Sequence, residues 1–99
     1  MKTVAQIKMR LEELKPTLEE KFQVEAIGVF GSYARGEQTI KSDVDVLVEF
    51  ASDAHIGLFK YVELELYLSE QLGVKVDLVA RGGLKPSLKD QILREVVYV

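Results

Sequence analysis

Apolar residues along this chain recur with helical spacing in some segments and with strand spacing in others. The first segment has one apolar stripe at intervals of three and four, formed by Val4, Ile7, Leu11, Leu14, Leu18 and Phe22. Such spacing predicts an amphipathic helix with one buried face. Pro16 falls inside this stripe, so we expect a kink or a break near Lys15.

The remainder of the chain predicts a small sheet with helices between its strands. Apolar or alternating runs predict strands over residues 24–30, 43–50 and 74–79. A short helix over 31–35 is expected to end at Gly36, and a long helix over 56–72 at Gly73. Ser87 and Asp90 have the spacing of a capping box for a last helix that runs to about Glu95.

This order of elements predicts the fold class. We expect an α/β (α+β) domain with a three-stranded mixed sheet flanked by about four helices. The apolar tail over 96–99 has two interpretations, a contact with another chain or a strand that closes the core. A length of 99 residues is that of a single domain, residues 1–99.

Composition narrows the class of protein. The chain is 47% hydrophobic and 29% charged, as in a globular domain, and it has no cysteine. Its net charge of −3 argues against a general nucleic-acid-binding surface, so no direct nucleic-acid partner is expected. No stretch has the ~20 apolar residues needed to cross a bilayer, and the N-terminus does not resemble a signal peptide. We therefore expect a cytoplasmic protein without a membrane partner.

Three aspartates are placed where their side chains can converge. Asp43 and Asp45 are two residues apart on one predicted strand and therefore project from the same face. Asp77 belongs to a strand that can lie beside theirs. Three such carboxylates would repel one another, and divalent metal resolves the conflict because Mg²⁺ prefers carboxylate and phosphate oxygens. We expect these aspartates to be metal ligands.

A glycine–serine turn precedes this acidic strand by a fixed distance. Gly31 and Ser32 follow the first predicted strand, and ten residues separate Ser32 from Asp43. A glycine lets a phosphate approach the backbone, and the first N–H groups of the short helix then face it. Arg35, one helical turn later, can reach the same oxygens.

Each of these phosphate-binding residues also has a purely structural interpretation. Ser32 by itself suits a helix cap, and Arg35 suits a surface ion pair. Lys41 and Ser42 are weaker candidates for the same nucleotide site, and Ser42 also suits a turn before the strand. The lone His55 is interpreted as a solvated loop residue.

The complete motif resembles a known family. Gly31-Ser32, ten residues and Asp43-x-Asp45, with a later strand acid at Asp77, are similar to the nucleotidyltransferase superfamily of the DNA polymerase β type. Within it, the sequence resembles the minimal nucleotidyltransferases, in particular MntA-like antitoxins paired with HEPN-domain toxins. The resemblance implies a polymerase-β-like core and transfer of AMP from ATP with two Mg²⁺ ions.

The resemblance also implies roles for individual residues. Gly31 and Ser32 would hold the triphosphate, and Asp43 and Asp45 would ligate metal. Asp77 would ligate one metal and help to deprotonate the acceptor. The acceptor implied is a tyrosine hydroxyl on a partner ribonuclease toxin, whose adenylylation silences it.

Two other functions remain open from the sequence. The chain could inhibit its partner by steric occlusion, with a nucleotide site that is vestigial or regulatory. It could instead be a nucleotidyltransferase for a small molecule or an RNA end. The chain is too short for a second, acceptor-holding domain, which argues against a small-molecule acceptor, and its acidic balance argues against RNA. We therefore expect a protein acceptor.

Overall fold

The strands form one mixed sheet in the order β3-β2-β1-β4. The computed structural model describes residues 1–99. β1 (Val24–Phe30) pairs antiparallel with β2 (Val44–Phe50), and β2 pairs parallel with β3 (Val76–Ala80). The parallel pair is joined through α3 (Leu58–Leu72), as a parallel connection requires.

The sheet has four strands, one more than the three that the sequence predicts. Residues Val97–Tyr98 form β4, which pairs antiparallel with β1. Gly28 permits this pairing, because a Cβ at that position would lie 2.7 Å from Cγ2 of Val96 and 2.9 Å from the carbonyl oxygen of Val97. The apolar tail is thus a strand of the sheet. A run of two paired residues is too short to show strand periodicity in the sequence.

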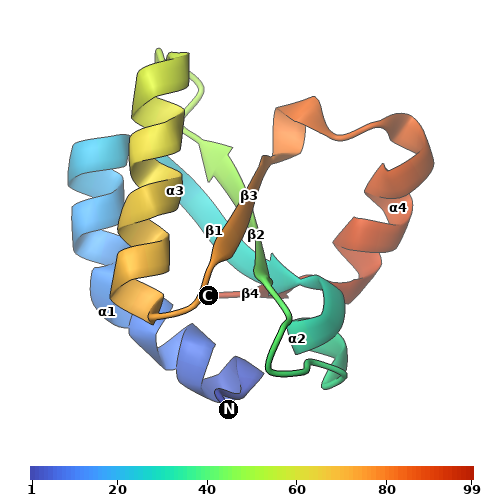
Figure 1. Ribbon diagram of the computed structural model, residues 1–99. Helices are drawn as coiled ribbons and strands as arrows, with labels where there is room; N and C mark the ends of the chain where they lie inside the picture. Colours follow the sequence, from blue (N-terminus) through green and yellow to red (C-terminus); the bar gives the residue numbers. More distant parts are fainter.

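Two helices cover one face of the sheet. α1 (Val4–Phe22) and α3 lie side by side there, whereas α2 (Gly31–Arg35) and α4 (Pro86–Glu95) lie on the other side of the strands (Figure 1). The core lies under α1 and α3, and its helical members are Ile7, Leu11, Leu14, Leu18, Phe22, Leu64, Leu68 and Leu72. This arrangement leaves part of the opposite face of the sheet available for a site.

α1 continues past its proline. The helix runs unbroken from Val4 to Phe22 with Pro16 inside it, so the break considered near Lys15 does not occur. Pro16 removes one hydrogen bond, but buried residues on both sides of it pack into the same core and hold the helix together. At the N-terminus, the side chains and backbones of Thr3 and Gln6 form a reciprocal capping box.

The last helix starts differently from the prediction. α4 begins at Pro86, with Lys85 as a cap residue that makes no side-chain hydrogen bond, so the capping box at Ser87 and Asp90 is wrong. Proline suits the first helical turn because the N–H it lacks has no acceptor there. A single 3-10 turn, η1 (Arg81–Gly83), leads from β3 toward this helix. None of the helices is both long enough and apolar enough to span a membrane.

Side chains of α3 fix the free edge of β3. The backbone N–H of Leu78 donates to Oε2 of Glu65 at 2.9 Å, and that of Val76 donates to Oγ of Ser69 at 2.9 Å. These bonds satisfy edge groups that would otherwise be open to another strand. They also hold the strand segment on both sides of Asp77.

Candidate active site

The three aspartates lie at neighbouring positions of β2 and β3. Asp45 is paired directly with Asp77 across the parallel strands, so both project from the same face. Asp43 stands two positions before Asp45 and lies just ahead of β2. The backbone N–H of Val44 donates to the carbonyl oxygen of Lys75 at 2.9 Å and fixes this end of the strand pair. The topology therefore brings together the three acids that the sequence singles out.

The glycine–serine turn lies against these acids. Phe30 is the register partner of Asp45, so α2 begins directly beside the acidic strand. Gly31 has φ +74°, and a Cβ on it would stand 2.0 Å from Oδ2 of Asp45. Both observations require glycine at this position, one for the backbone conformation and one for space. The two halves of the motif thus share one site.

The charge environment of Asp45 is unfavourable for a bare carboxylate. Partial burial, followed by the neighbouring charges of Asp77 and Asp43, raises the pKa of Asp45 from 3.8 to about 6. Arg35 opposes this rise, and Glu95 adds to it. A divalent cation beside Asp45 would relieve this repulsion, so the donor chemistry fits the metal that the sequence implies.

The carboxylates do not yet form a closed ligand set. No group of three or more His, Cys, Asp or Glu side chains in the protein is arranged to hold a metal ion. Asp43 instead lies near Lys75, with Oδ2 and Nζ 3.9 Å apart. The three acids therefore share a face of the sheet without forming a ready-made metal site. Their roles as metal ligands stay a prediction.

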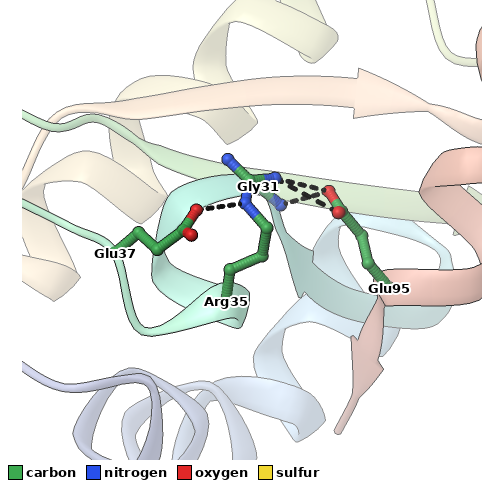
Figure 2. Close-up of polar contacts among 4 residues, drawn as sticks. All are labelled: Gly31, Arg35, Glu37 and Glu95. Carbon is green, nitrogen blue, oxygen red and sulfur yellow. Dashed lines mark hydrogen bonds and ion pairs between the residues drawn. The ribbon is translucent and has the colours of Figure 1, made fainter.

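Some of the hydrogen-bond donors expected to bind phosphate are free, and others already donate to protein acceptors. The Ser32 hydroxyl makes no hydrogen bond to the protein, and its side chain is partly exposed. The backbone N–H of Gly31 donates to Oε1 of Glu95 at 2.9 Å. Arg35 donates from Nε to Glu37 at 2.7 Å and from Nη1 to both oxygens of Glu95 at 3.2 and 3.1 Å (Figure 2).

Glu95 contacts the site, although no motif in the sequence indicates it. It ends α4, 64 residues after Gly31, and a single glutamate at a helix end has no distinctive pattern. The two acidic partners of Arg35 raise the pKa of its guanidinium; the hydrogen bond to Glu37 is the larger cause and that to Glu95 the next. The structural interpretation of Arg35 as an ion-pair residue is therefore correct, although its Nη2 group makes no hydrogen bond to the protein.

Lys41 and Ser42 lie beside Asp43 at one side of the site. Oγ of Ser42 accepts a 2.8 Å hydrogen bond from the backbone N–H of Thr39. Ser42 is therefore a residue of the turn before β2, which is one of the two roles that the sequence suggests. An open cavity of about 340 Å³ adjoins the aspartate there. Its lining includes Ser42, Asp43 and three lysines, Lys2, Lys41 and Lys75. This cavity places positive charge next to the acids.

Comparison with known proteins assigns the family. The family model described as the nucleotidyltransferase domain matches residues 11–99. The chain belongs to the nucleotidyltransferase domain family. This nucleotidyltransferase is 48% identical over 99 residues to protein adenylyltransferase MntA of Thermococcus cleftensis, and the match covers all of this chain and 98% of that protein.

Solved structures agree with this assignment. The nucleotidyltransferase superimposes with a TM-score of 0.79 on a structure provisionally described as a minimal nucleotidyltransferase, at 36% identity, covering 97% of this chain and 95% of the other. It is also similar to a chain of a toxin–antitoxin complex with AMP-PNP, with a TM-score of 0.75 and 25% identity over 92% of this chain and 70% of that chain. The expected α+β nucleotidyltransferase fold is thus confirmed, with a fourth strand added.

Proposed function

We propose that this nucleotidyltransferase transfers AMP from ATP to a hydroxyl group of a partner protein. The observation that carries the proposal is the shared site of the Gly31-Ser32 turn and Asp45, because a nucleotidyl transfer requires phosphate donors and acids at one place. The name of the Thermococcus cleftensis relative, a protein adenylyltransferase, supports a protein acceptor. The toxin–antitoxin complex with AMP-PNP, an ATP analogue, supports ATP as the donor.

The residues have distinct tasks in the proposed reaction. The Ser32 hydroxyl and Nη2 of Arg35 are donors without protein acceptors, and they would bind phosphate oxygens of ATP. The lysine-lined cavity beside Asp43 would attract the negatively charged end of the triphosphate. Ser42 would contribute from the turn that borders this cavity.

The chemistry joins the acceptor hydroxyl oxygen to the α-phosphorus of ATP and breaks the bond to the β-phosphate, which releases pyrophosphate. Asp77 would accept the proton of the attacking hydroxyl. Asp43, Asp45 and Asp77 would hold Mg²⁺, which when bound supplies positive charge that activates the hydroxyl and stabilises the leaving pyrophosphate. The protein's own contribution is largely positioning and electrostatics.

The partner we propose is a HEPN-domain ribonuclease toxin. The form of the motif, Gly31 to Gly36 followed by Asp43-x-Asp45, resembles the antitoxins paired with such toxins. One structural neighbour is itself part of a toxin–antitoxin complex. In this pairing the acceptor is a tyrosine hydroxyl of the toxin, and its adenylylation abolishes the toxin's activity.

Transfer of labelled phosphate tests the proposed reaction. The purified protein is incubated with Mg²⁺, ATP and the protein encoded next to it, with label in the α- or the γ-phosphate. Transfer of AMP moves the α-label and never the γ-label into the partner. Asp45→Asn and Asp77→Asn are expected to lower transfer at least ~100-fold, whereas Asp53→Asn, in an exposed turn after β2, leaves it unchanged.

Protection of cells separates catalysis from steric inhibition. An enzyme whose Asp45 is neutralised no longer protects a cell that expresses the toxin. A protein that inhibits only by occlusion still protects, because the substitution leaves its surface almost unchanged. Protection by Asp45→Asn, together with absent α-label, would refute the proposed function.

A further inference from the structure

The carboxylate of Glu95 contacts two residues of the nucleotide site, Gly31 and Arg35, that precede it in the sequence by 64 and 60 positions. Oε1 accepts the backbone N–H of Gly31 at 2.9 Å, and both carboxylate oxygens accept from Nη1 of Arg35 (Figure 2). The Glu95 side chain is only 19% exposed, against 44% for Arg35. Hydrogen bonds with an ionised partner in a partly buried place are stronger than neutral ones.

Packing alone does not account for this placement. No residue of α4 is fully buried, and its only partly buried apolar residues are Ile92 and Leu93, so the helix adds little to the core. The Glu95 charge also acts unfavourably on Asp45 across the site. A glutamate this close to the aspartates adds repulsion, which its bonds to Gly31 and Arg35 offset. The position therefore indicates a role in the site.

The contact restricts the movement of Arg35. Glu37 holds Nε on one side and Glu95 holds Nη1, so the guanidinium is bonded at two of its three nitrogens. Only Nη2 has no protein acceptor. A guanidinium held in this way loses little additional freedom when its remaining N–H groups bind an anion.

We propose that Glu95 is a positioning residue for nucleotide binding, which holds the Gly31 backbone and the Arg35 guanidinium in place for the triphosphate. This inference rests on the proposed function. Glu95 itself touches neither the nucleotide nor the acceptor, and it acts through its two partners. It also makes α4 and the adjoining β4 part of the nucleotide site, because Glu95 ends the helix and β4 begins two residues later.

Binding of AMP-PNP with Mg²⁺, measured by calorimetry, tests the role. Glu95→Ala is expected to weaken binding about 10- to 100-fold, the range for loss of a charged hydrogen-bonded partner. Glu95→Gln is expected to lose less, because its amide oxygen still accepts the Gly31 N–H. Asp90→Ala, an exposed acid of the same helix, serves as control and is expected to bind like the wild type.

A double-mutant cycle with Arg35→Ala separates positioning from general destabilisation. If Glu95 acts through Arg35, Glu95→Ala has a smaller effect on binding in the Arg35→Ala background than in the wild type. Equal losses in both backgrounds, accompanied by a lower melting temperature, would indicate a structural role only and overturn the inference.

The remaining outcomes are equally distinct. Tighter AMP-PNP binding by Glu95→Ala would mean that the carboxylate competes with phosphate and must be displaced, and this would overturn positioning. Unchanged binding in both Glu95 variants would overturn it as well. If the wild type fails to bind AMP-PNP at all, the proposed function fails first, and that result is distinguishable from a failure confined to Glu95.

Discussion

Oδ2 of Asp45 lies 2.0 Å from the point where a Cβ on Gly31 would stand. This contact joins the turn after β1 to the acidic strand β2. Residue 31 therefore can carry no side chain while Asp45 keeps its position. The absence of a side chain at Gly31 thus leaves the space that the Asp45 carboxylate occupies.

Substitution of Gly31 provides the first prediction. Gly31→Ala is expected to destabilise the fold by about 2 kcal/mol or more, because φ is +74° and the methyl group displaces Asp45. AMP-PNP binding should weaken more than tenfold. Gly36→Ala is a matched control, since Gly36 also has positive φ, +71°, but a Cβ there meets nothing within 4 Å.

Chemical denaturation and calorimetry on both variants check this prediction. Gly36→Ala is expected to lose only about 1 kcal/mol and to bind AMP-PNP normally. Equal nucleotide binding by the Gly31 and Gly36 variants would show that contact with Asp45 has no importance for the site.

The raised pKa of Asp45 predicts a pH-dependent stability. A carboxyl group whose pKa rises from 3.8 to about 6 on folding binds its proton more tightly in the native state. The free energy of unfolding therefore falls as the pH rises from about 4 to 6. Below about pH 4 the carboxyl is protonated in both the native and the unfolded state and does not lower the stability. The full shift corresponds to about 3 kcal/mol, and solvent screening of this partly exposed group reduces the expected effect to about 1–2 kcal/mol.

Asp45→Asn tests whether ionisation of Asp45 lowers the stability, because it removes the charge with little change in shape. In the presence of a metal chelator, the variant should be about 1–2 kcal/mol more stable than the wild type at pH 7 and equal to it near pH 3.5. Urea unfolding of the variant and the wild type at several pH values measures the difference in their free energies of unfolding. A variant that is less stable than the wild type at pH 7 would contradict the electrostatic account of the site.

Gly28 allows a test of the role of β4. Gly28→Ala is expected to push the last strand away from β1, because the new methyl group would lie 2.7 Å from Val96 and 2.9 Å from the backbone oxygen of Val97. Hydrogen exchange of the Val99 amide, which donates to the carbonyl of Ile27, should become faster. AMP-PNP binding should weaken if Glu95 moves with the strand.

Gly82→Ala is the control for that experiment, since a Cβ at position 82 has no neighbour within 4 Å. Unchanged exchange at Val99 in Gly28→Ala would mean that the strand accommodates the methyl group.

Pro16 provides a prediction about stability alone. Pro16→Ala is expected to stabilise the protein by about 1–3 kcal/mol, because alanine restores the missing helical N–H and position 16 is exposed. The melting temperature should rise, while AMP-PNP binding stays unchanged. Thr17→Ala, at the exposed neighbouring position, should change stability by less than about 0.5 kcal/mol. A lower melting temperature for Pro16→Ala would show that the proline favours the fold.

Local patterns were sufficient for most elements and for the acids of the site. The strand over 24–30 and the helix over 31–35 lie where the sequence predicts them, since apolar runs and a following glycine act over a few residues. The helix through Pro16 could not be predicted from propensity, because its continuity depends on core contacts on both sides of the proline. The sequence left two interpretations of the apolar tail open, a contact with another chain or a strand, because only the pairing of β4 with β1 decides between them.

By itself, the sequence determined the order of the elements and the spacing of the motif, which are consequences of local backbone chemistry and side-chain periodicity. Tertiary structure alone decided that Asp45 pairs with Asp77, that Oδ2 of Asp45 borders Gly31, and that Glu95 reaches Arg35. These relationships depend on strand register and on the docking of α4. The register is fixed only when distant segments bury their apolar surface together, and α4 is joined to α2 by the long-range bonds of Glu95, which exist only in the folded chain.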